Sequence, residues 1–110
     1  MKNIVNLTPH DISVINEKGE TIVFPSSGII ARVSQMSEKA FDLNGIEVFQ
    51  SSFGEVLGLP EQREDGTMFL VSGIVLSACK GRVDLVAPKT DSTAVRNEAG
   101  HIVAVRGFLY

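Results

Sequence analysis

Short apolar runs alternate with turn-forming residues along the whole chain, a spacing typical of short β-strands. The run from Met1 to Leu7 predicts an opening strand, which ends where Pro9 fixes its own φ angle and keeps Thr8 extended. The runs ISVIN and TIVF flank the polar EKGE and predict a β-hairpin with Gly19 in its turn. After a break at PSSG, the run IIARVSQ predicts another short strand.

The middle of the chain mixes ambiguous and clear patterns. MSEKAFDLNG fits either a loop or one helical turn, whereas IEVFQSSFGEV predicts a strand in which Gly54 marks a bulge. The polar GLPEQREDGT follows as a loop, with a turn signal at DGT. The sequence therefore predicts two short strands here, with an undecided connection between them.

The most apolar segment is MFLVSGIVLSACKG. Met68 to Val71 predict a buried strand. Ser72 can then cap a short helix from Gly73 to Lys80, and Gly81 is expected to end it. The alternative is one long buried strand through the same residues. RVDLVAP predicts a further strand that ends at Pro88, and KTDST is a polar loop into the last hairpin.

These elements add up to seven or eight short strands and one short helix. No linker, low-complexity tract or charge block interrupts them, so residues 1–110 are expected to form a single domain. The predicted fold class is α+β and mainly β, with an antiparallel sheet or β-roll of short hairpins packed on the helix.

The last hairpin carries the tripeptide Ala-Val-Arg on both sides of the turn-like Asn97–Gly100. Symmetric pairing about that turn places Arg96 opposite His101 and Asp91 opposite Arg106. Side chains alternate between the faces of a strand, so Arg96 and Arg106 fall on opposite faces in this register. A bulge at the turn glycine would slip the register and change this arrangement.

Arg106 has two interpretations in that register. It shares its face with three apolar side chains, and a buried guanidinium needs a partner because an unpaired buried charge is very costly. One interpretation is a structural ion pair with Asp91. The other is a pocket rim at which Arg106 donates two hydrogen bonds to a phosphate. Arg96, on the other face, is expected to be a solvated charge.

Composition narrows the class of protein. Hydrophobic residues make up 44% of the chain and charged residues 21%, as in ordinary soluble domains. No apolar run is long enough to span a membrane, and the start lacks the apolar core of a signal peptide, so we expect a cytoplasmic protein without a membrane partner. Cys79 is the only cysteine, which excludes an intrachain disulfide and a thiolate metal cluster.

The charge distribution bears on the kind of ligand. The formal net charge is −3 and no cluster of Lys and Arg occurs, so binding to DNA or RNA polymers is disfavoured. A few isolated arginines can nevertheless hold a small ligand that carries one or two phosphates.

Catalytic and metal-binding patterns are weak. His10 and Asp11 offer the start of a metal site, but His101 is the only other histidine and no ligand spacing follows. A nucleophile elbow and a Cys–His pair are both lacking, and Cys79 fits the apolar core. We therefore expect no enzyme and no cofactor, and interpret LTPH as a structural turn in which Thr8 or His10 bonds to the backbone.

Six motifs cover nearly the whole chain in this order: NLTPHDI, PSSGIIARV, FGEVLGLP, FLVSGIV, GRVDLVAP and AVRNEAGHIVAVRGF. In this order the chain resembles small phage and prophage proteins of the Thoeris anti-defence sponge family, of the first type described. The resemblance implies binding of cyclic ADP-ribose isomers, which such sponges hold without cleavage so that the downstream immune effector stays inactive. Some members are described as binding cyclic oligonucleotides of the CBASS defence system as well.

The resemblance also implies an assembly and a site. The family forms homodimers or larger homo-oligomers whose pockets both subunits complete, in an infected or prophage-carrying bacterium. Its pockets use arginines near the C-terminal hairpin and a polar residue in the preceding loop. Carried onto this sequence, this implies a phosphate donor at Arg106, a second donor at Arg96, and ribose or adenine contacts from Thr90 and Asp91.

Further residues complete the expected site. Arg32, in the motif PSSGIIARV, is implied as a contact reaching the ligand across a subunit interface. An adenine ring needs an apolar or aromatic wall, and Phe69 or Phe108 can supply it because base stacking contributes about 1–3 kcal/mol.

Two other functions stay open from the sequence. A small acidic protein of this kind also suits an interaction protein that inhibits a host defence enzyme by direct contact. An enzyme that degrades the same nucleotides is the third hypothesis, although the sequence shows no nucleophile paired with a base.

Overall fold

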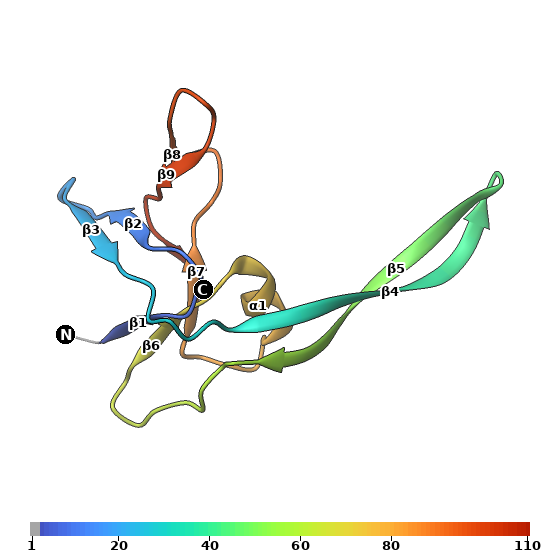
Figure 1. Ribbon diagram of the computed structural model, residues 1–110, viewed down its shortest axis with the longest axis horizontal. Helices are drawn as coiled ribbons and strands as arrows, with labels where there is room; N and C mark the ends of the chain where they lie inside the picture. The colour runs from blue at the N-terminus through green and yellow to red at the C-terminus, as the bar shows by residue number, and fades with distance from the viewer. Residues whose placement is uncertain (1–2) are drawn as a thin grey trace.

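Four strands from distant parts of the chain form the central sheet (Figure 1). The computed structural model describes residues 3–110. In it the order of strands is β1 (Ile4–Asn6), β6 (Met68–Leu70), β7 (Leu85–Pro88) and β10 (Phe108–Leu109). β1, β6 and β7 run parallel, and β10 is antiparallel to β7. The sheet is therefore mixed. Parallel neighbours require a crossover connection, and α1 (Gly73–Ala78) provides it between β6 and β7.

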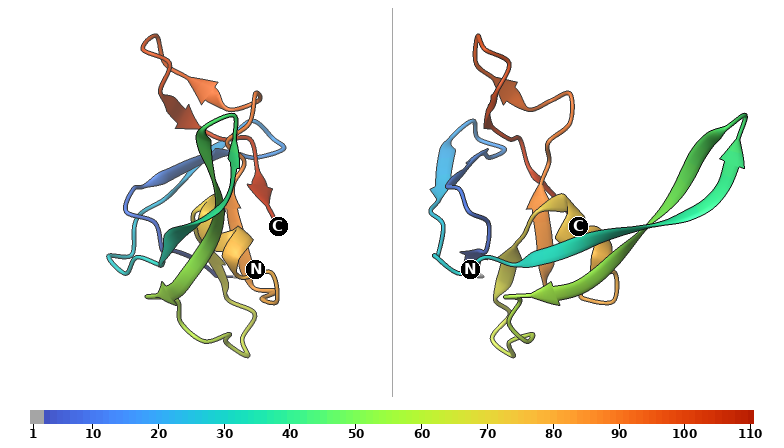
Figure 2. Two further views of the ribbon diagram at one scale, coloured as in Figure 1. Left: turned by 90° about the vertical axis from the view of Figure 1, so that its right-hand side faces the viewer. Right: turned by 45° about the vertical axis from the view of Figure 1, so that its right-hand side comes forward.

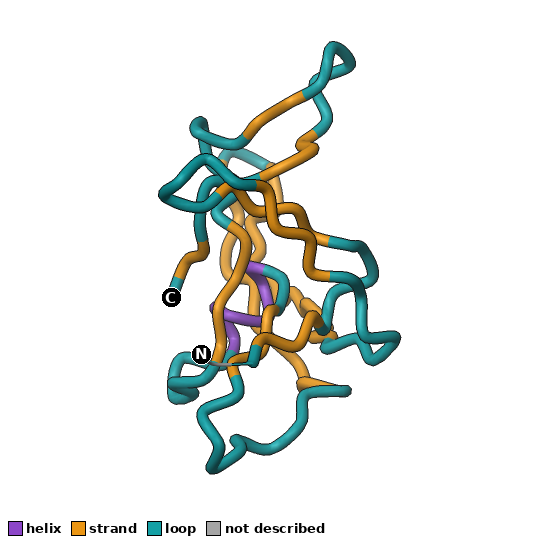
Figure 3. Tube along the Cα trace, turned by 90° about the vertical axis from the view of Figure 1, so that its left-hand side faces the viewer, coloured by secondary structure: helices purple, strands orange, loops and turns teal. Residues whose placement is uncertain are grey.

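Three antiparallel hairpins surround this sheet. They are β2 (Ile12–Ile15) with β3 (Thr21–Phe24), β4 (Arg32–Leu43) with β5 (Ile46–Leu57), and β8 (Val95–Arg96) with β9 (Ile102–Ala104). Within residues 3–110 there are thus ten strands and one helix, and the predicted α+β, mainly β class is confirmed. Figure 3 marks that short helix among the strands. The count exceeds the expected seven or eight strands, partly because β8 and β10 are only two residues long.

The core lies between the central sheet and α1. It consists of buried apolar side chains from five segments: Leu7, Ala31, Phe69, Val71, Val75 and Leu85. Ser72 caps α1 as predicted, because its hydroxyl accepts a hydrogen bond from the backbone N–H of Val75 at 3.4 Å. The helix ends at Ala78, two residues before the predicted Lys80, because the backbone of Cys79 leaves the helical conformation, with φ −118° and ψ 48°.

The N-terminal elements agree with the sequence pattern. The predicted opening strand is β1 in its described part, and Met1 and Lys2 lie outside the described residues. The hairpin of β2 and β3 forms with Gly19 in its turn, as predicted. β2 also joins the last hairpin, since the Ile15 N–H donates to the Val105 carbonyl at 2.8 Å. The two small hairpins therefore lie together above the sheet (Figure 1).

The motif NLTPH forms a polar turn in which Asn6 and Thr8 are buried. The Asn6 amide donates to the carbonyls of His10 and Phe24, each at 2.8 Å, and its oxygen accepts from the Thr8 N–H and hydroxyl. The Thr8 hydroxyl also lies 2.9 Å from the His10 carbonyl. The prediction of a structural turn with Thr8 bonded to the backbone is confirmed. The turn holds the end of β1 against the end of β3.

The largest departure from the sequence pattern is β4. MSEKAFDLNG is neither a loop nor a helical turn, and IIARVSQ is not a short strand, because β4 runs continuously from Arg32 to Leu43. Asn44 (φ 51°) and Gly45 (φ 81°) make a two-residue turn, and Leu43 pairs with Ile46 across it. The paired strands, residues 32–57, form a ribbon that we call the arm. It projects well beyond the body, which extends the molecule to 53 Å (Figures 1 and 2).

The predicted bulge at Gly54 is also present. Pairing passes from Phe53 opposite Gln35 to Val56 opposite Val33, so the register shifts across Gly54. Below this point Val33 and Val56 turn toward the core and anchor the arm. The described residues include no helix with the length and apolar character that crossing a membrane requires.

Candidate functional site

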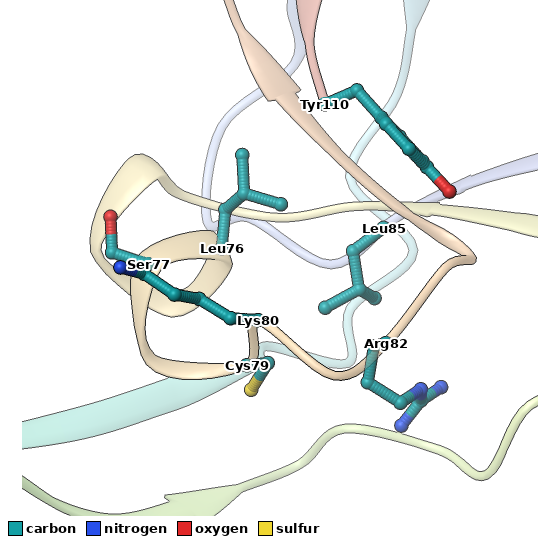
Figure 4. A pocket seen from close by; sticks show the side chains of 7 residues that line it. All are labelled: Leu76, Ser77, Cys79, Lys80, Arg82, Leu85 and Tyr110. Atoms are coloured by element: carbon teal, nitrogen blue, oxygen red, sulfur yellow. The ribbon is translucent and has the colours of Figure 1, made fainter.

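A hollow with a volume of about 410 Å³ lies between α1 and β7. We call it the α1–β7 pocket, and Figure 4 shows the side chains that line it: Leu76, Ser77, Cys79, Lys80, Arg82, Leu85 and Tyr110. Leu76 and Leu85 lie in the middle, and the polar ends of the other side chains lie around them (Figure 4). The pocket thus has an apolar floor and a polar rim.

Local backbone contacts build this rim. The chain turns sharply after α1, where the Arg82 N–H donates to the Cys79 carbonyl at 3.0 Å. Tyr110 closes the far side, and its hydroxyl donates to the Val83 carbonyl at 2.8 Å. The rest of the Tyr110 side chain remains largely uncovered, since the residue is 77% exposed. An aromatic ring held at its hydroxyl end is therefore available to a flat ligand.

Arg82 is fixed by a bidentate ion pair with Asp84. Its Nε donates to Oδ1 at 2.8 Å and its Nη2 to Oδ2 at 2.7 Å, while Nη2 also reaches the Pro60 carbonyl at 2.9 Å. The hydrogen bond from Arg82 lowers the pKa of the buried Asp84 carboxyl, and the same bond raises the pKa of Arg82. The guanidinium is thus charge-balanced, whereas Lys80 forms no ion pair within residues 3–110.

Replacing Asp84 with asparagine is expected to destabilise the protein by about 2 kcal/mol at neutral pH, because Arg82 loses its buried partner but keeps some contact with water. The lowered pKa means that this stabilisation is complete above the unfolded carboxyl value of about 3.9 and disappears as pH falls through the lower folded pKa. Urea denaturation across this range should show the difference between wild type and variant shrink with acid.

The matched control for Asp84 is Asp42→Asn. Asp42 pairs with Lys39 at 3.1 Å, but both side chains are about half exposed. Exposed pairs contribute about 0–1 kcal/mol, so this variant should change stability little at any pH. Equal effects of the two substitutions would show that the Arg82–Asp84 pair adds no more than a surface contact.

The last hairpin does not take the predicted register. Val95 pairs with Ala104 and Arg96 with Ile102, with an irregularity between Val95 and Arg96, so Arg96 is not opposite His101. Relative to symmetric pairing, the partner of Arg96 is displaced by one residue and that of Val95 by two, because the irregularity between them adds an extra residue, as a bulge does. Symmetric pairing had assumed that the turn residues alone separate the strands.

The prediction of an ion pair between Asp91 and Arg106 is also wrong, because it depended on the symmetric register. Asp91 instead accepts from the N–H and hydroxyl of Thr93, at 2.9 and 2.5 Å, and pairs with Lys89 at 3.2 Å. The Thr93 hydrogen bonds, with help from Lys89, lower the pKa of Asp91 to about 2. Arg106 is exposed, and within residues 3–110 no hydrogen bond or ion pair holds its side chain.

The other hairpin candidates lie apart from Arg106. Arg96 is exposed and donates to the Gly100 carbonyl at 2.8 Å beside the turn, in agreement with the expected solvated charge. Thr90 lines a small hollow of about 110 Å³ against β9. Arg106 lies beyond the base of the hairpin, next to Val105, which bridges to β2. Arg96 is therefore held at the turn end of the hairpin and Arg106 lies beyond its base.

Phe69 and Phe108, the two rings expected to stack on a base, differ in how far they are buried. Phe69 is fully buried in the core with the Arg63 guanidinium carbon 5.3 Å from its ring centroid, so its expected role as a stacking wall is corrected to a core role. A fully buried ring has no face available to a base. Phe108 is half-buried, with its ring centroid 5.7 Å from that of Phe24.

Arg32 lies in a separate hollow of about 300 Å³ at the base of the arm. Its neighbours there include Thr8, Pro9 and Ile74, so three of the sequence motifs meet at this place. Among the described residues, none of the seven predicted site residues lines the α1–β7 pocket.

Sequence reasoning missed Lys80 and Tyr110. The available signal was the segment CKGR, in which the cations Lys80 and Arg82 directly follow an apolar helix. The chain reverses there, and both side chains line the pocket. Nothing in the local pattern could have placed Tyr110 there, because β10 reaches the pocket only through its pairing with β7.

The fold and the pocket define a class: a small, mainly β domain with an open site that combines an apolar floor, an aromatic ring and a lysine that forms no ion pair within residues 3–110. Comparison of the chain with protein families, with curated proteins and with solved structures found no match in any of the three. Among residues 3–110, no group of three or more His, Cys, Asp or Glu side chains is placed to hold a metal ion.

Proposed function

We propose that this protein binds and sequesters a cyclic nucleotide signal of the cyclic ADP-ribose type, without cleaving it, and so blocks a Thoeris-type immune response. The observation that carries the binding proposal is the α1–β7 pocket, with leucines between Lys80 and Tyr110 (Figure 4). The choice of cyclic ADP-ribose rests on the order of sequence motifs. Cyclic oligonucleotides are a second ligand of the same chemical class.

The pocket matches the chemistry of such a ligand. Its volume of about 410 Å³ suits a small molecule, since ligand sites span roughly 300–1,000 Å³. A base can stack on the Tyr110 ring, which contributes about 1–3 kcal/mol. The Lys80 ammonium can approach a phosphate as a point charge, and the leucine floor can cover the apolar face of the ligand.

A panel of cyclic ADP-ribose isomers and cyclic oligonucleotides tests the function by thermal denaturation. A ligand present at about 100 times its Kd should raise stability by about 2.7 kcal/mol, equivalent to about 10 °C in melting temperature for a domain of this size. Heating the complex should release the ligand intact. Turnover of excess ligand would instead identify an enzyme, and the absence of any shift across the panel at micromolar ligand would reject the proposal.

Substitution of Lys80 with alanine is expected to weaken binding by about 10- to 100-fold, because it removes one charge-assisted hydrogen bond. Lys18→Ala is the matched control, since it removes the same charge from the exposed turn between β2 and β3. Arg106→Ala, in the same titration, tests whether the ligand binds at the C-terminal hairpin, as expected from the sequence. This variant should leave the fold intact. Loss of binding in Arg106→Ala with retention in Lys80→Ala would move the site to the hairpin.

A second function is favoured by the exposed apolar side chains of the arm. The protein would then inhibit a host defence enzyme by direct contact. That function requires a host protein that co-purifies with the chain in stoichiometric amount, together with no nucleotide-dependent rise in melting temperature.

A further inference from the structure

The tip of the arm carries the dipeptide Asn44-Gly45, which joins β4 to β5 at the end farthest from the body (Figures 1 and 2). Both residues are exposed, and they form the one Asn-Gly pair of the sequence. An asparagine before glycine can lose its side-chain amide, because the next backbone nitrogen can attack the side-chain carbonyl carbon and glycine has no Cβ to hinder it. The arm tip therefore has the composition of a chemically reactive turn.

The five asparagines of the chain differ in how their side chains are held. Asn6, Asn16 and Asn97 each accept two hydrogen bonds at the side-chain oxygen, whereas within residues 3–110 no hydrogen bond holds the Asn44 side chain. Asn3 precedes a β-branched residue, whose side chain hinders attack by its backbone nitrogen. Among the described residues, only Asn44 combines an unrestrained side chain with a following glycine.

The attacking nitrogen is also available. In the described part of the chain the Gly45 N–H makes no backbone hydrogen bond, whereas the N–H groups of Gly19 and Gly100 each donate to a carbonyl at 3.0 Å. No atom lies within 4 Å of the position that a Cβ atom would take at Gly45. A two-stranded ribbon without a further layer is marginally stable, so its tip can open locally and let the Asn44 side chain approach the nitrogen.

The turn Asp65-Gly66 has a related sequence but is protected. Thr67 donates its N–H and its hydroxyl to Asp65 Oδ1, at 2.9 and 2.6 Å. These hydrogen bonds lower the pKa of Asp65, so its side chain is an ionised carboxylate at neutral pH. A carboxylate resists attack by nitrogen, because it is negatively charged and lacks a good leaving group. Asn44 differs in that its amide is neutral and unrestrained.

We propose that Asn44 is a site of spontaneous deamidation in the folded protein. The Gly45 nitrogen gives its proton to hydroxide and forms a bond to Asn44 Cγ. The bond between Cγ and Nδ2 breaks, and the amide nitrogen takes up a proton from water and leaves as ammonia. Water then opens the resulting five-membered succinimide ring. Attack at Cγ gives an aspartate, and attack at the main-chain carbonyl carbon gives an isoaspartate, in which the backbone runs through the side chain.

The two products change the arm tip in different ways. Both add a carboxylate, which makes the net charge one unit more negative than −3. Isoaspartate also adds one atom to the backbone, which a two-residue turn that pairs Leu43 with Ile46 does not accommodate, so this pairing should be lost. The inference does not rest on the proposed nucleotide binding, since neither Asn44 nor Gly45 lines the α1–β7 pocket.

Peptide mapping of the full chain by mass spectrometry tests the proposal. The folded protein is kept at physiological temperature, at neutral and at mildly alkaline pH, and is then digested beside a sample that was not incubated. We expect Asn44 to convert more than about tenfold faster than any other asparagine, with isoaspartate among the products and a rate that rises with hydroxide concentration. An Asn44 amide that stays intact, or equal conversion at another asparagine, would overturn the proposal.

Glu98→Gly is the matched control. It places a glycine after Asn97 in another exposed hairpin turn, where the N–H groups of Ala99 and His101 each donate to the Asn97 side-chain oxygen at 3.0 Å. Asn97 in this variant should therefore convert more slowly than Asn44 in the same molecule. Equal rates would show that the following glycine alone determines deamidation, and the structural argument for Asn44 would fail.

Discussion

Replacement of Gly58 with alanine is expected to lower the free energy of unfolding by about 4 kcal/mol, since a positive φ costs about 1–3 kcal/mol and a forced backbone shift about as much again. Gly58 has φ +77°, and a Cβ atom there would lie 2.2 Å from the Ile30 carbonyl oxygen. That oxygen belongs to the backbone and cannot rotate away. The chain segments before β4 and after β5 would have to separate at the base of the arm.

Gly100→Ala is the control for this substitution. Its φ is +85°, close to that of Gly58, but no atom lies within 4 Å of the added Cβ. It should therefore show the conformational cost alone, about 1 kcal/mol. Urea denaturation followed by circular dichroism compares the two variants. If both lose the same stability, the close approach to Ile30 is not what requires glycine at position 58.

Local signals were sufficient for several elements. Ser72 preceded an apolar segment of helical length, and its hydroxyl caps α1 where the pattern placed it. Gly19 between two apolar runs identified the hairpin of β2 and β3. In each case the interactions that decide the structure lie within a few residues of each other along the chain.

The arm was missed because two local signals disagreed. Glu38, Lys39 and Ala40 are good helix formers, and charged residues interrupt the apolar alternation, so the segment resembled a loop or a helical turn. The decisive signal was Asn44-Gly45, since this dipeptide adopts the two positive φ angles of a tight hairpin turn. Once that turn forms, the strand IEVFQSSFGEV draws the preceding residues into register as β4.

The candidate site was missed for a different reason. Symmetric register placed Asp91 beside Arg106, but an irregularity at Val95 slips the pairing and Asp91 closes a local turn with Thr93. A one-residue slip changes the partner of every following side chain, and no local pattern fixes it. The α1–β7 pocket combines residues 76–85 with Tyr110, and only the pairing of β7 with β10 brings them together.

Asn6→Ala is the second substitution with a large expected effect, about 3 kcal/mol. Asn6 is 2% exposed and forms four hydrogen bonds through its side chain. Alanine would leave the Thr8 N–H and the Phe24 carbonyl without this partner, and each unsatisfied buried group costs about 1–3 kcal/mol. The His10 carbonyl would keep its contact with the Thr8 hydroxyl.

Asn16 provides the comparison for Asn6. Its side-chain oxygen also accepts two backbone hydrogen bonds, from Lys18 at 3.0 Å and Glu20 at 2.9 Å, but in an exposed turn. Water can replace those bonds, so Asn16→Ala should cost about 1 kcal/mol or less. Urea denaturation of both variants measures what burial and the two additional hydrogen bonds of Asn6 contribute together. Equal losses would mean that they add nothing at Asn6. A much larger loss in Asn6→Ala would show that NLTPH is part of the scaffold, because the Asn6 side chain is what ties β1 to the end of β3.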